Sequence, residues 1–350
     1  MLPDALSASA LGRTAVETRT LRQRIETATT EIGTGRTGEF YGDLGVDSRR
    51  SLDLRAELGR ATTHVGTIDR TLGRAGAMQE ALGRLQVIAG QFTAEALRLN
   101  TLPPEVAANA ALAARAALAE VAGLLNLRQD GEYLFAGSDS ANPPVAPAGD
   151  VFASPMVQQI VAAVATLAPG NGAAVVAATV AAVEDDTAGD NPFARFVTDP
   201  ATAAASFRRS TVSADGAEVA WGAFAGEGSA RVAVGELVRG LAIIAGLTGA
   251  ENAQGAAFTE LLDSARAALS AASRGIASEQ AVLGSAEQRL AAARDSALDR
   301  SVLLRKQVAT IEEVDVAETV TKLQALRTRL EASYRAMSIL SELSLTRFLR

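Results

Sequence analysis

The stretch from Glu312 to Arg350 constrains the fold most, because it contains neither glycine nor proline. Its apolar residues recur at alternating steps of three and four, which places them along one side of an α-helix. This C-terminal stripe comprises Val316, Val320, Leu323, Leu330, Tyr334 and Met337, and it continues in a shifted phase through Leu340, Leu343 and Leu345. An isolated helix gains little stability from propensity alone, so this helix is expected to pack against a partner.

A second stripe with the same spacing lies near the N-terminus, from Leu11 to Ile32. Its members are Leu11, Ala15, Thr18, Leu21, Ile25, Ala28 and Ile32. Two amphipathic helices at opposite ends of one chain are expected to pair with each other or with neighbouring copies. The predicted assembly interface therefore combines Leu11, Leu21, Ile25 and Ile32 with Val316, Val320, Leu323, Leu330, Tyr334, Met337, Leu343, Leu345 and Phe348.

The N-terminal helix is followed by Gly33-Thr34-Gly35-Arg36-Thr37-Gly38, which has the literal form of a dinucleotide-binding fingerprint. That fingerprint requires a strand before it and a helix directly after it. Here a helix precedes the glycines and the irregular segment 38–47 follows them. We therefore interpret the glycines as a helix stop and a joint.

The remaining chain alternates long helical patterns with short strand signals. Helices are expected over residues 48–99, 104–128, 229–247 and 256–310, a short strand over 131–138, and a hairpin within 207–225 around Ala214-Asp215-Gly216. The predicted fold is mainly α, an elongated bundle of long antiparallel helices formed by the N- and C-terminal segments with a smaller α/β insertion. The expected domains are 1–45 with 305–350, 46–140 with 230–304, and the outer insertion 141–229.

Composition and charge exclude several classes of protein. Cysteine is absent, which excludes disulfides and thiolate metal sites. The net charge of −7 is concentrated in residues 131–255, where 5 basic and 13 acidic side chains give −8. No basic stripe for nucleic acid is present. No apolar run is expected to reach the roughly 18 residues of a membrane span, and the N-terminus lacks the pattern of a cleaved secretory signal.

Two features invite a catalytic or metal-binding interpretation. His64 is the only histidine, and without a second histidine or a cysteine it lacks the companions of a metal site. The carboxylates Glu184-Asp185-Asp186 could serve as acid and base, but no partner residues accompany them, and a solvated loop is the simpler interpretation. We therefore expect no catalytic residues, no metal and no cofactor.

Three segments together resemble the flagellin superfamily. The N-terminal helix ending in Ile32-Gly33-Thr34-Gly35-Arg36 is similar to the leading helix of that superfamily. The run Leu125-Asn-Leu-Arg-Gln-Asp-Gly-Glu-Tyr-Leu-Phe-Ala-Gly-Ser-Asp139 resembles its hook–filament junction branch. So does the ending Leu340-Ser-Glu-Leu-Ser-Leu-Thr-Arg-Phe-Leu349, which fits a Ser-Leu-x-x-aromatic-Leu pattern. The resemblance covers about residues 5–140 and 215–350.

The resemblance implies a structural subunit that joins the flagellar hook to the filament. It implies partners as well: flagellin, the other hook-associated junction protein, further copies in a ring, and a cytoplasmic export chaperone. Export without a cleaved signal through the flagellar type III apparatus would place the protein outside the cell. Flagellin itself remains an alternative, and an extracellular enzyme or adhesin on a helical scaffold is an alternative of another class.

Overall fold

The structure is a computed structural model that describes residues 3–38, 40–100, 103–137, 139–145, 151–185, 209–212, 218–222, 225 and 228–348. Within these ranges, the side chains of residues 3–12, 104, 228 and 340–348 are not described. The long helices are α1 (Pro3–Thr34), α2 (Ser48–Leu99), α3 (Pro104–Leu125), α8 (Gly228–Ala245), α9 (Ala256–Glu312) and α10 (Val316–Phe348). The expectation of a mainly α fold with long antiparallel helices is confirmed.

Shorter elements fill the connections between these helices. They are the helices α4 (Pro155–Ala165) and α5 (Gly172–Glu184), the 3-10 turns η1 (Tyr41–Asp47), η2 (Leu134–Ala136) and η3 (Ala250–Gln254), and the strands β1 (Arg128–Gln129), β2 (Glu132–Tyr133), β3 (Arg209–Val212) and β4 (Glu218–Trp221). The strands form two antiparallel pairs, β1 with β2 and β3 with β4.

The chain divides into two compact units. Unit 1 comprises Met1–Thr63 and Ala297–Arg350, and unit 2 comprises His64–Ser296. Helices α2 and α9 each contribute a segment to both units. The division into domains 1–45 with 305–350, 46–140 with 230–304, and 141–229 stays a prediction. The elements of the predicted insertion pack within unit 2 together with the long helices.

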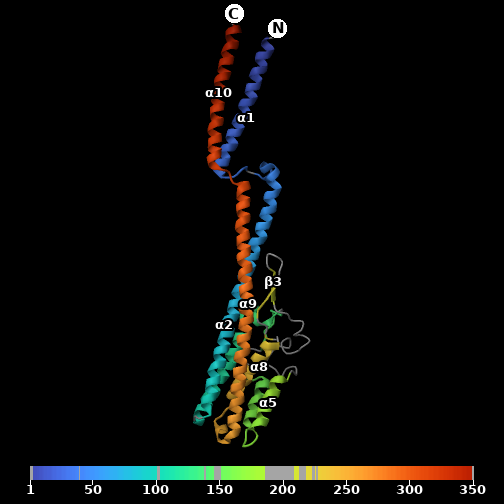
Figure 1. The fold of residues 1–350 in the computed structure, drawn as a ribbon, viewed down its shortest axis with the longest axis vertical. Coiled ribbons are helices and arrows are strands. Elements are labelled where there is room, and N and C mark those ends of the chain that lie inside the picture. The colour runs from blue at the N-terminus through green and yellow to red at the C-terminus, as the bar shows by residue number, and fades with distance from the viewer. Residues whose placement is uncertain are drawn as a thin grey trace. The chain divides into compact units, whose positions relative to one another are not determined.

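Unit 1 is built around the pair of terminal helices. Helices α1 and α10 run antiparallel and side by side, so that α1 begins where α10 ends (Figure 1). The segments of α2 and α9 in this unit are joined by ion pairs, including Arg300 with Glu57 and Arg55 with Glu312. Every element of unit 1 is a helix or a joint between helices.

Unit 2 contains the hydrophobic core. Helix α8 packs against α3, α4 and α5, and α4 also packs against α5. The core is made of aliphatic side chains with few aromatic rings, as the 4% aromatic content requires. Its largest fully buried members are Phe135, Ile68, Met78, Leu85, Ile88, Leu99, Leu118, Leu125, Met156, Ile160, Leu237 and Leu241.

Two glycines allow α8 and α9 to approach closely. A Cβ atom at Gly240 would lie 2.5 Å from Cγ of Leu269, and one at Gly275 would lie 2.5 Å from Cβ of Ala233. No real Cβ atom tolerates such distances, so larger residues at these positions would force the two helices apart. The small-residue composition of the chain therefore serves tight helix packing here.

The predicted strands are only partly confirmed. Within the segment 131–138, only Glu132 and Tyr133 form a strand, and Leu134–Ala136 turn into η2 and bury Phe135. Ser138 lies outside the described residues. The predicted hairpin within 207–225 is confirmed by the pairing of β3 with β4, whereas its turn at Ala214-Asp215-Gly216 lies outside the described residues.

The expectation that no apolar run reaches membrane-spanning length is wrong for α3. The stretch Glu105–Leu125 has a mean hydropathy of 1.3 and is long enough to cross a membrane by length and composition. In the structure, 44% of this window is buried, and α3 packs against α8 through residues such as Ala111, Ala114 and Leu118. A helix buried in a protein core has the same composition as a membrane span, because both face apolar surroundings.

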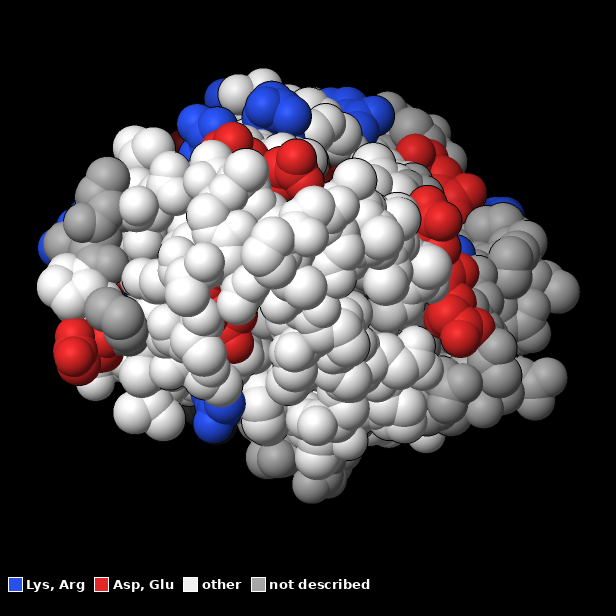
Figure 2. Space-filling view, turned by 90° about the horizontal axis from the view of Figure 1, so that it is seen from below, with Lys and Arg blue, Asp and Glu red and all other residues white. Residues whose placement is uncertain are grey.

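The end of unit 2 presents a largely uncharged surface. Figure 2 looks onto this end from below and shows no Lys, Arg, Asp or Glu at the centre of the visible face, with acidic side chains gathered along one margin. In keeping with this, α5 carries no charged residue before its last, Glu184. The exposed side of α5 is formed by alanines, including Ala173, Ala174, Ala177 and Ala178.

Candidate assembly site

A seam between α1 and α10 is the first part of the site. On α10, the less exposed positions follow an unbroken four–three spacing of Thr319, Leu323, Leu326, Leu330, Ser333 and Met337. On α1, the corresponding positions are Thr14, Thr18, Leu21, Ile25, Ala28 and Ile32. Only Thr18, Ala28, Thr319 and Leu326 are fully buried. The seam therefore leaves most of its apolar side chains half-exposed.

The predicted interface residues divide into three groups. Leu21, Ile25, Ile32, Val320, Leu323, Leu330 and Met337 are half-buried. Val316 and Tyr334 are exposed, at 47% and 40%. The side chains of Leu11, Leu343, Leu345 and Phe348 lie outside the described residues. As residues that bind other subunits, all of them remain predictions.

The sequence analysis missed the most buried leucine of the seam. Leu326 is 5% exposed, whereas Arg327, which shares the expected stripe with Val316 and Val320, is exposed. The true phase includes two hydroxyl residues, Thr319 and Ser333. A stripe chosen by hydrophobicity passes over these residues and shifts by one position toward Val320 and Tyr334. Strict four–three spacing from Leu323 through Leu326 and Leu330 to Met337 would have found the seam.

A contact between Arg22 and Tyr334 fixes the register of the helix pair. The Arg22 guanidinium donates to the Tyr334 hydroxyl from Nε at 2.8 Å and from a terminal nitrogen at 2.5 Å. Its carbon lies 5.6 Å from the centre of the tyrosine ring. Tyr334 therefore holds α1 at the edge of the seam, and its exposed face remains accessible.

The joint after α1 is encoded by glycines. Helix α1 ends at Thr34, and Gly35 and Gly38 have positive φ angles of 69° and 99°. A Cβ atom at Gly38 would lie 2.4 Å from Cβ of Asp43, whose carboxylate accepts a 2.8 Å hydrogen bond from the Phe40 amide. These are conformations that glycine adopts without strain. The interpretation of Gly33–Gly38 as a helix stop and a joint agrees with this geometry.

The joint displays apolar side chains beside a polar hollow. Phe40 and Val46 are 71% and 97% exposed, and Tyr41 is exposed as well. A hollow of about 580 Å³ lies between α1 and the joint, and it is lined by Gln23, Glu26, Thr27, Thr30, Glu31, Arg36, Thr37, Gly38 and Asp43. The surface at the base of the helix pair thus combines exposed rings with carboxylates.

The break between α9 and α10 faces this joint. Helix α9 ends at Glu312 and α10 begins at Val316. The Thr37 amide donates to the Glu312 carbonyl at 2.8 Å, the Val314 amide donates to the Gly35 carbonyl at 3.1 Å, and Arg36 and Glu313 form an isolated antiparallel bridge. The two joints therefore form a short piece of β-structure.

The Glu312 carboxylate is held by α2. The Arg55 guanidinium donates to both carboxylate oxygens, with Nε at 2.6 Å from Oε1, and the Ser51 hydroxyl also donates to Oε1. Glu312 is only 9% exposed. Hydrogen bonds from Arg55 lower the pKa of Glu312 to about 2, despite burial, which acts in the opposite direction. The same contact raises the pKa of Arg55. We call Ser51, Arg55 and Glu312 the clasp.

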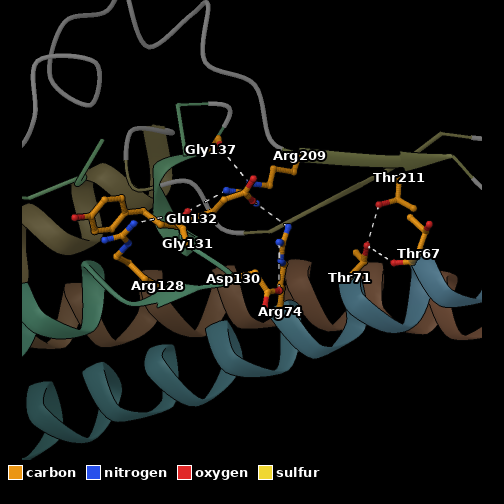
Figure 3. A network of polar contacts seen from close by, with 11 residues as sticks. Thr67, Thr71, Arg74, Arg128, Asp130, Gly131, Glu132, Gly137, Arg209 and Thr211 are labelled. Atoms are coloured by element: carbon orange, nitrogen blue, oxygen red, sulfur yellow. Dashed lines mark hydrogen bonds and ion pairs between the residues drawn. The ribbon is translucent and has the colours of Figure 1, made fainter. Parts of the chain in front are cut away.

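A polar network in unit 2 surrounds the glycine–aromatic run Gly131–Gly137 (Figure 3). Arg209 of β3 forms an ion pair with Glu132 at 2.7 Å and donates to the carbonyls of Tyr133 and Gly137 at 3.0 and 3.1 Å. Arg74 of α2 contacts Glu132 at 3.1 Å from the other side. Glu132 thus links the β1–β2 hairpin to both α2 and β3.

The network continues at both sides of this centre. Arg128 donates to the Gly131 carbonyl at 2.7 Å and lies over the ring of Tyr133. The hydroxyls of Thr71 and Thr211 lie 3.2 Å apart (Figure 3). The run that resembles the junction branch is thereby fixed in place by residues distant in sequence, which no local pattern could reveal.

The candidate catalytic features have no such surroundings. His64 is half-buried, and Glu184 is exposed at the end of α5, while Asp186 lies outside the described residues. Among the described residues, no group of three or more His, Cys, Asp or Glu side chains could hold a metal ion. The geometry of the described chain thus concentrates its organised contacts in the seam, the joints, the clasp and the network.

Comparison with known proteins gives one family match. Residues 267–349, which contain most of α9 and all of α10 with the break between them, match the bacterial flagellin C-terminal helical region. No curated protein sequence matches the chain significantly. The family match supports membership of the flagellin superfamily, and it indicates a structural, non-enzymatic component of the bacterial flagellum that is extracellular and self-assembles.

Proposed function

We propose that the chain is the hook–filament junction subunit of a bacterial flagellum. The observation that carries the proposal is the presence, in one chain, of the flagellin C-terminal match and of the run Leu125–Asp139 that resembles the junction branch. In this role the subunit forms a ring of identical copies between the other hook-associated junction protein and the first flagellin layer. It leaves the cell through the flagellar type III apparatus with the help of a cytoplasmic chaperone.

The half-open seam supports a role in assembly. The predicted interface residues Leu21, Ile25, Leu323 and Leu330 are only half-buried between α1 and α10. Two paired helices that leave apolar surface open gain stability when further helices cover it. In the ring, the seam would be covered by terminal helices of neighbouring copies, and Val316 and Tyr334 would contact them directly.

Localisation tests the proposal. An epitope tag placed after Asp185 should label one narrow band at the hook end of purified hook–filament preparations. Deleting the gene should leave hooks without filaments and release flagellin monomers into the medium. Labelling along the whole filament would identify the chain as the filament subunit instead. Normal filaments on cells that lack the chain would contradict both structural roles.

The alternative of another class predicts a different result. An extracellular enzyme or adhesin carried on a helical scaffold would leave swimming unchanged when its gene is deleted. Motility in soft agar, measured for the deletion strain and for the complemented strain, therefore separates that alternative from both flagellar roles.

A further inference from the structure

The break between α9 and α10 has no local cause in the sequence. Residues 285–348 contain no glycine and no proline, the two residues that end helices most strongly. The three residues between the helices, Glu313, Val314 and Asp315, can all adopt helical conformations. The sequence therefore permits one continuous helix from Ala256 to Phe348.

Contacts from the other end of the chain hold the break open. Gly35 and Thr37 exchange backbone hydrogen bonds with Val314 and Glu312, and the clasp ties the Glu312 carboxylate to α2. None of these partners lies within 250 residues of the break along the chain. The break is thus imposed by tertiary contacts of the N-terminal segment.

The broken and continuous helices use different hydrogen bonds. In a continuous helix, the amides of Asp315 and Val316 would donate to the carbonyls of Ile311 and Glu312. In the described structure neither amide has an acceptor, and the Glu312 carbonyl accepts from Thr37 instead. The Asp315 carboxylate caps the new helix by accepting from the amides of Ala317 and Glu318 at 2.9 and 3.1 Å.

We infer that the α9–α10 break is a conformational switch operated by the N-terminal segment of the same chain. Until the Gly35–Thr37 joint and Arg55 dock, residues 312–316 form a continuous helix. Docking replaces the helical hydrogen bonds of Asp315 and Val316 with the bridge and the clasp, and α10 then lies against α1. As a device for assembly this inference rests on the proposed function, since the broken form is the one that enters the ring.

Residue-resolved amide exchange of the full-length monomer tests the switch. In the unmodified chain, the amides of residues 315 and 316 should exchange fast. Combining Arg55→Ala with Asp315→Ala removes the clasp and the cap, and should slow exchange at both positions by about tenfold or more as the helix closes. Arg50→Ala, which changes an exposed arginine of the same helix, is the matched control and should leave exchange unchanged. Equally fast exchange in the double variant would show that the break is encoded locally, and would overturn the inference.

A proline at the first position of α10 provides the opposite test. Val316→Pro forbids the continuous helix, because the residue before a proline avoids the helical conformation, but it suits the first turn of α10. Val316 is 47% exposed, so the variant should keep the Arg22–Tyr334 contact and the melting temperature of unit 1. Loss of the α1–α10 pair in Val316→Pro would contradict a broken native state. Both measurements use the monomer in solution, so their outcome is independent of where the subunit sits in the flagellum.

Discussion

The two units of the molecule differ in how they are held together. All twelve of the largest fully buried side chains lie in unit 2. The buried residues of unit 1 are mostly small or polar: Ala28, Ala61, Ala297, Leu304, Val308 and Leu326, with Thr18, Ser51, Ser301, Glu312 and Thr319. Unit 2 can therefore rely on hydrophobic burial, whereas unit 1 depends on ion pairs, on glycine conformations and on whatever covers its open seam.

Exposed apolar side chains show the same difference. Val16, Val302, Leu303 and Ile339 of unit 1 are all more than half exposed. These residues lie on helices that the described structure leaves without an outer layer. Such surfaces are common where a protein meets other chains, which agrees with a unit built for assembly. Four predictions test this contrast.

The largest expected effect is in the core of unit 2. Leu241→Asp places a carboxylate on α8 at a position that is 0% exposed. Truncating a buried leucine costs about 2–5 kcal/mol, and an unpaired buried charge adds to that cost, so unit 2 should fail to fold. Circular dichroism and the fluorescence of Trp221, the only tryptophan, report the loss. Val232→Asp on the same helix is 64% exposed and should change stability by less than about 0.5 kcal/mol.

A smaller effect is expected from the seam of unit 1. Leu326→Asp changes the most buried leucine between α1 and α10 and should cost about 2–4 kcal/mol, because water reaches the charge from the open side of the pair. The Trp221 transition, which reports on unit 2, should stay where it is. Under the proposed function, the variant is exported but supports no stable filament. Arg329→Ala, three residues away and exposed, is the control and should swim normally.

The fluorescence measurement decides whether the two units are separate in stability. If Leu326→Asp moved the Trp221 transition as far as Leu241→Asp does, the units would unfold together. A motile strain carrying Leu326→Asp with full filaments would remove the seam from the list of attachment surfaces. The half-buried neighbours Leu323 and Leu330 give weaker versions of the same test.

The sequence predicted the long helices well because their cause is local. The apolar period and the flanking turn residues placed a helix at 48–99, which matches α2 residue for residue, and the start of α9 at Ala256. The end of α1 was also predictable, since Gly35 and Gly38 carry the positive φ angles themselves. In each case the residues that determine the structure are the residues that adopt it.

The sequence could not reveal features whose cause is distant. The break at Glu313–Asp315 depends on Gly35, Thr37 and Arg55, and the conformation of the run Gly131–Gly137 depends on Arg209. The phase of the seam was missed for another reason. Thr319 is buried with its polar hydroxyl, so the true stripe carries a weaker hydrophobic signal than the shifted one. Pairing between segments hundreds of residues apart has no signature in either segment alone.

Acid should weaken unit 1 through the clasp. The pKa of Glu312 is lowered to about 2 in the folded chain from an ordinary value of 4.5. A depressed carboxylate pKa contributes stability that is fully present above pH 4.5 and is lost as the pH falls through about 2. Glu312→Gln should remove this part of the pH dependence and cost about 1–3 kcal/mol at neutral pH, a range reduced for the partial exposure of Arg55.

The pH measurement compares melting of unit 1 in the unmodified chain and in Glu312→Gln between pH 5 and pH 2. The difference between the two proteins should shrink toward zero at the acid end of this range. Glu313→Gln changes the neighbouring exposed carboxylate and serves as the control. A constant difference at every pH would show that Glu312 acts through its shape and hydrogen-bonding geometry, with no contribution from its charge.

The smallest effect is expected from an exposed ion pair in the same unit. Arg300 of α9 contacts Glu57 of α2, with side chains that are 50% and 34% exposed. Water screens both charges, so a double-mutant cycle of Arg300→Ala and Glu57→Ala should give a coupling of about 0–1 kcal/mol that declines with added salt. The clasp joins the same two helices but buries its carboxylate, and the corresponding cycle of Arg55→Ala with Glu312→Ala should give the larger coupling and resist salt. Equal couplings would mean that burial of Glu312 adds nothing, and that unit 1 is held by the number of its ion pairs irrespective of their exposure.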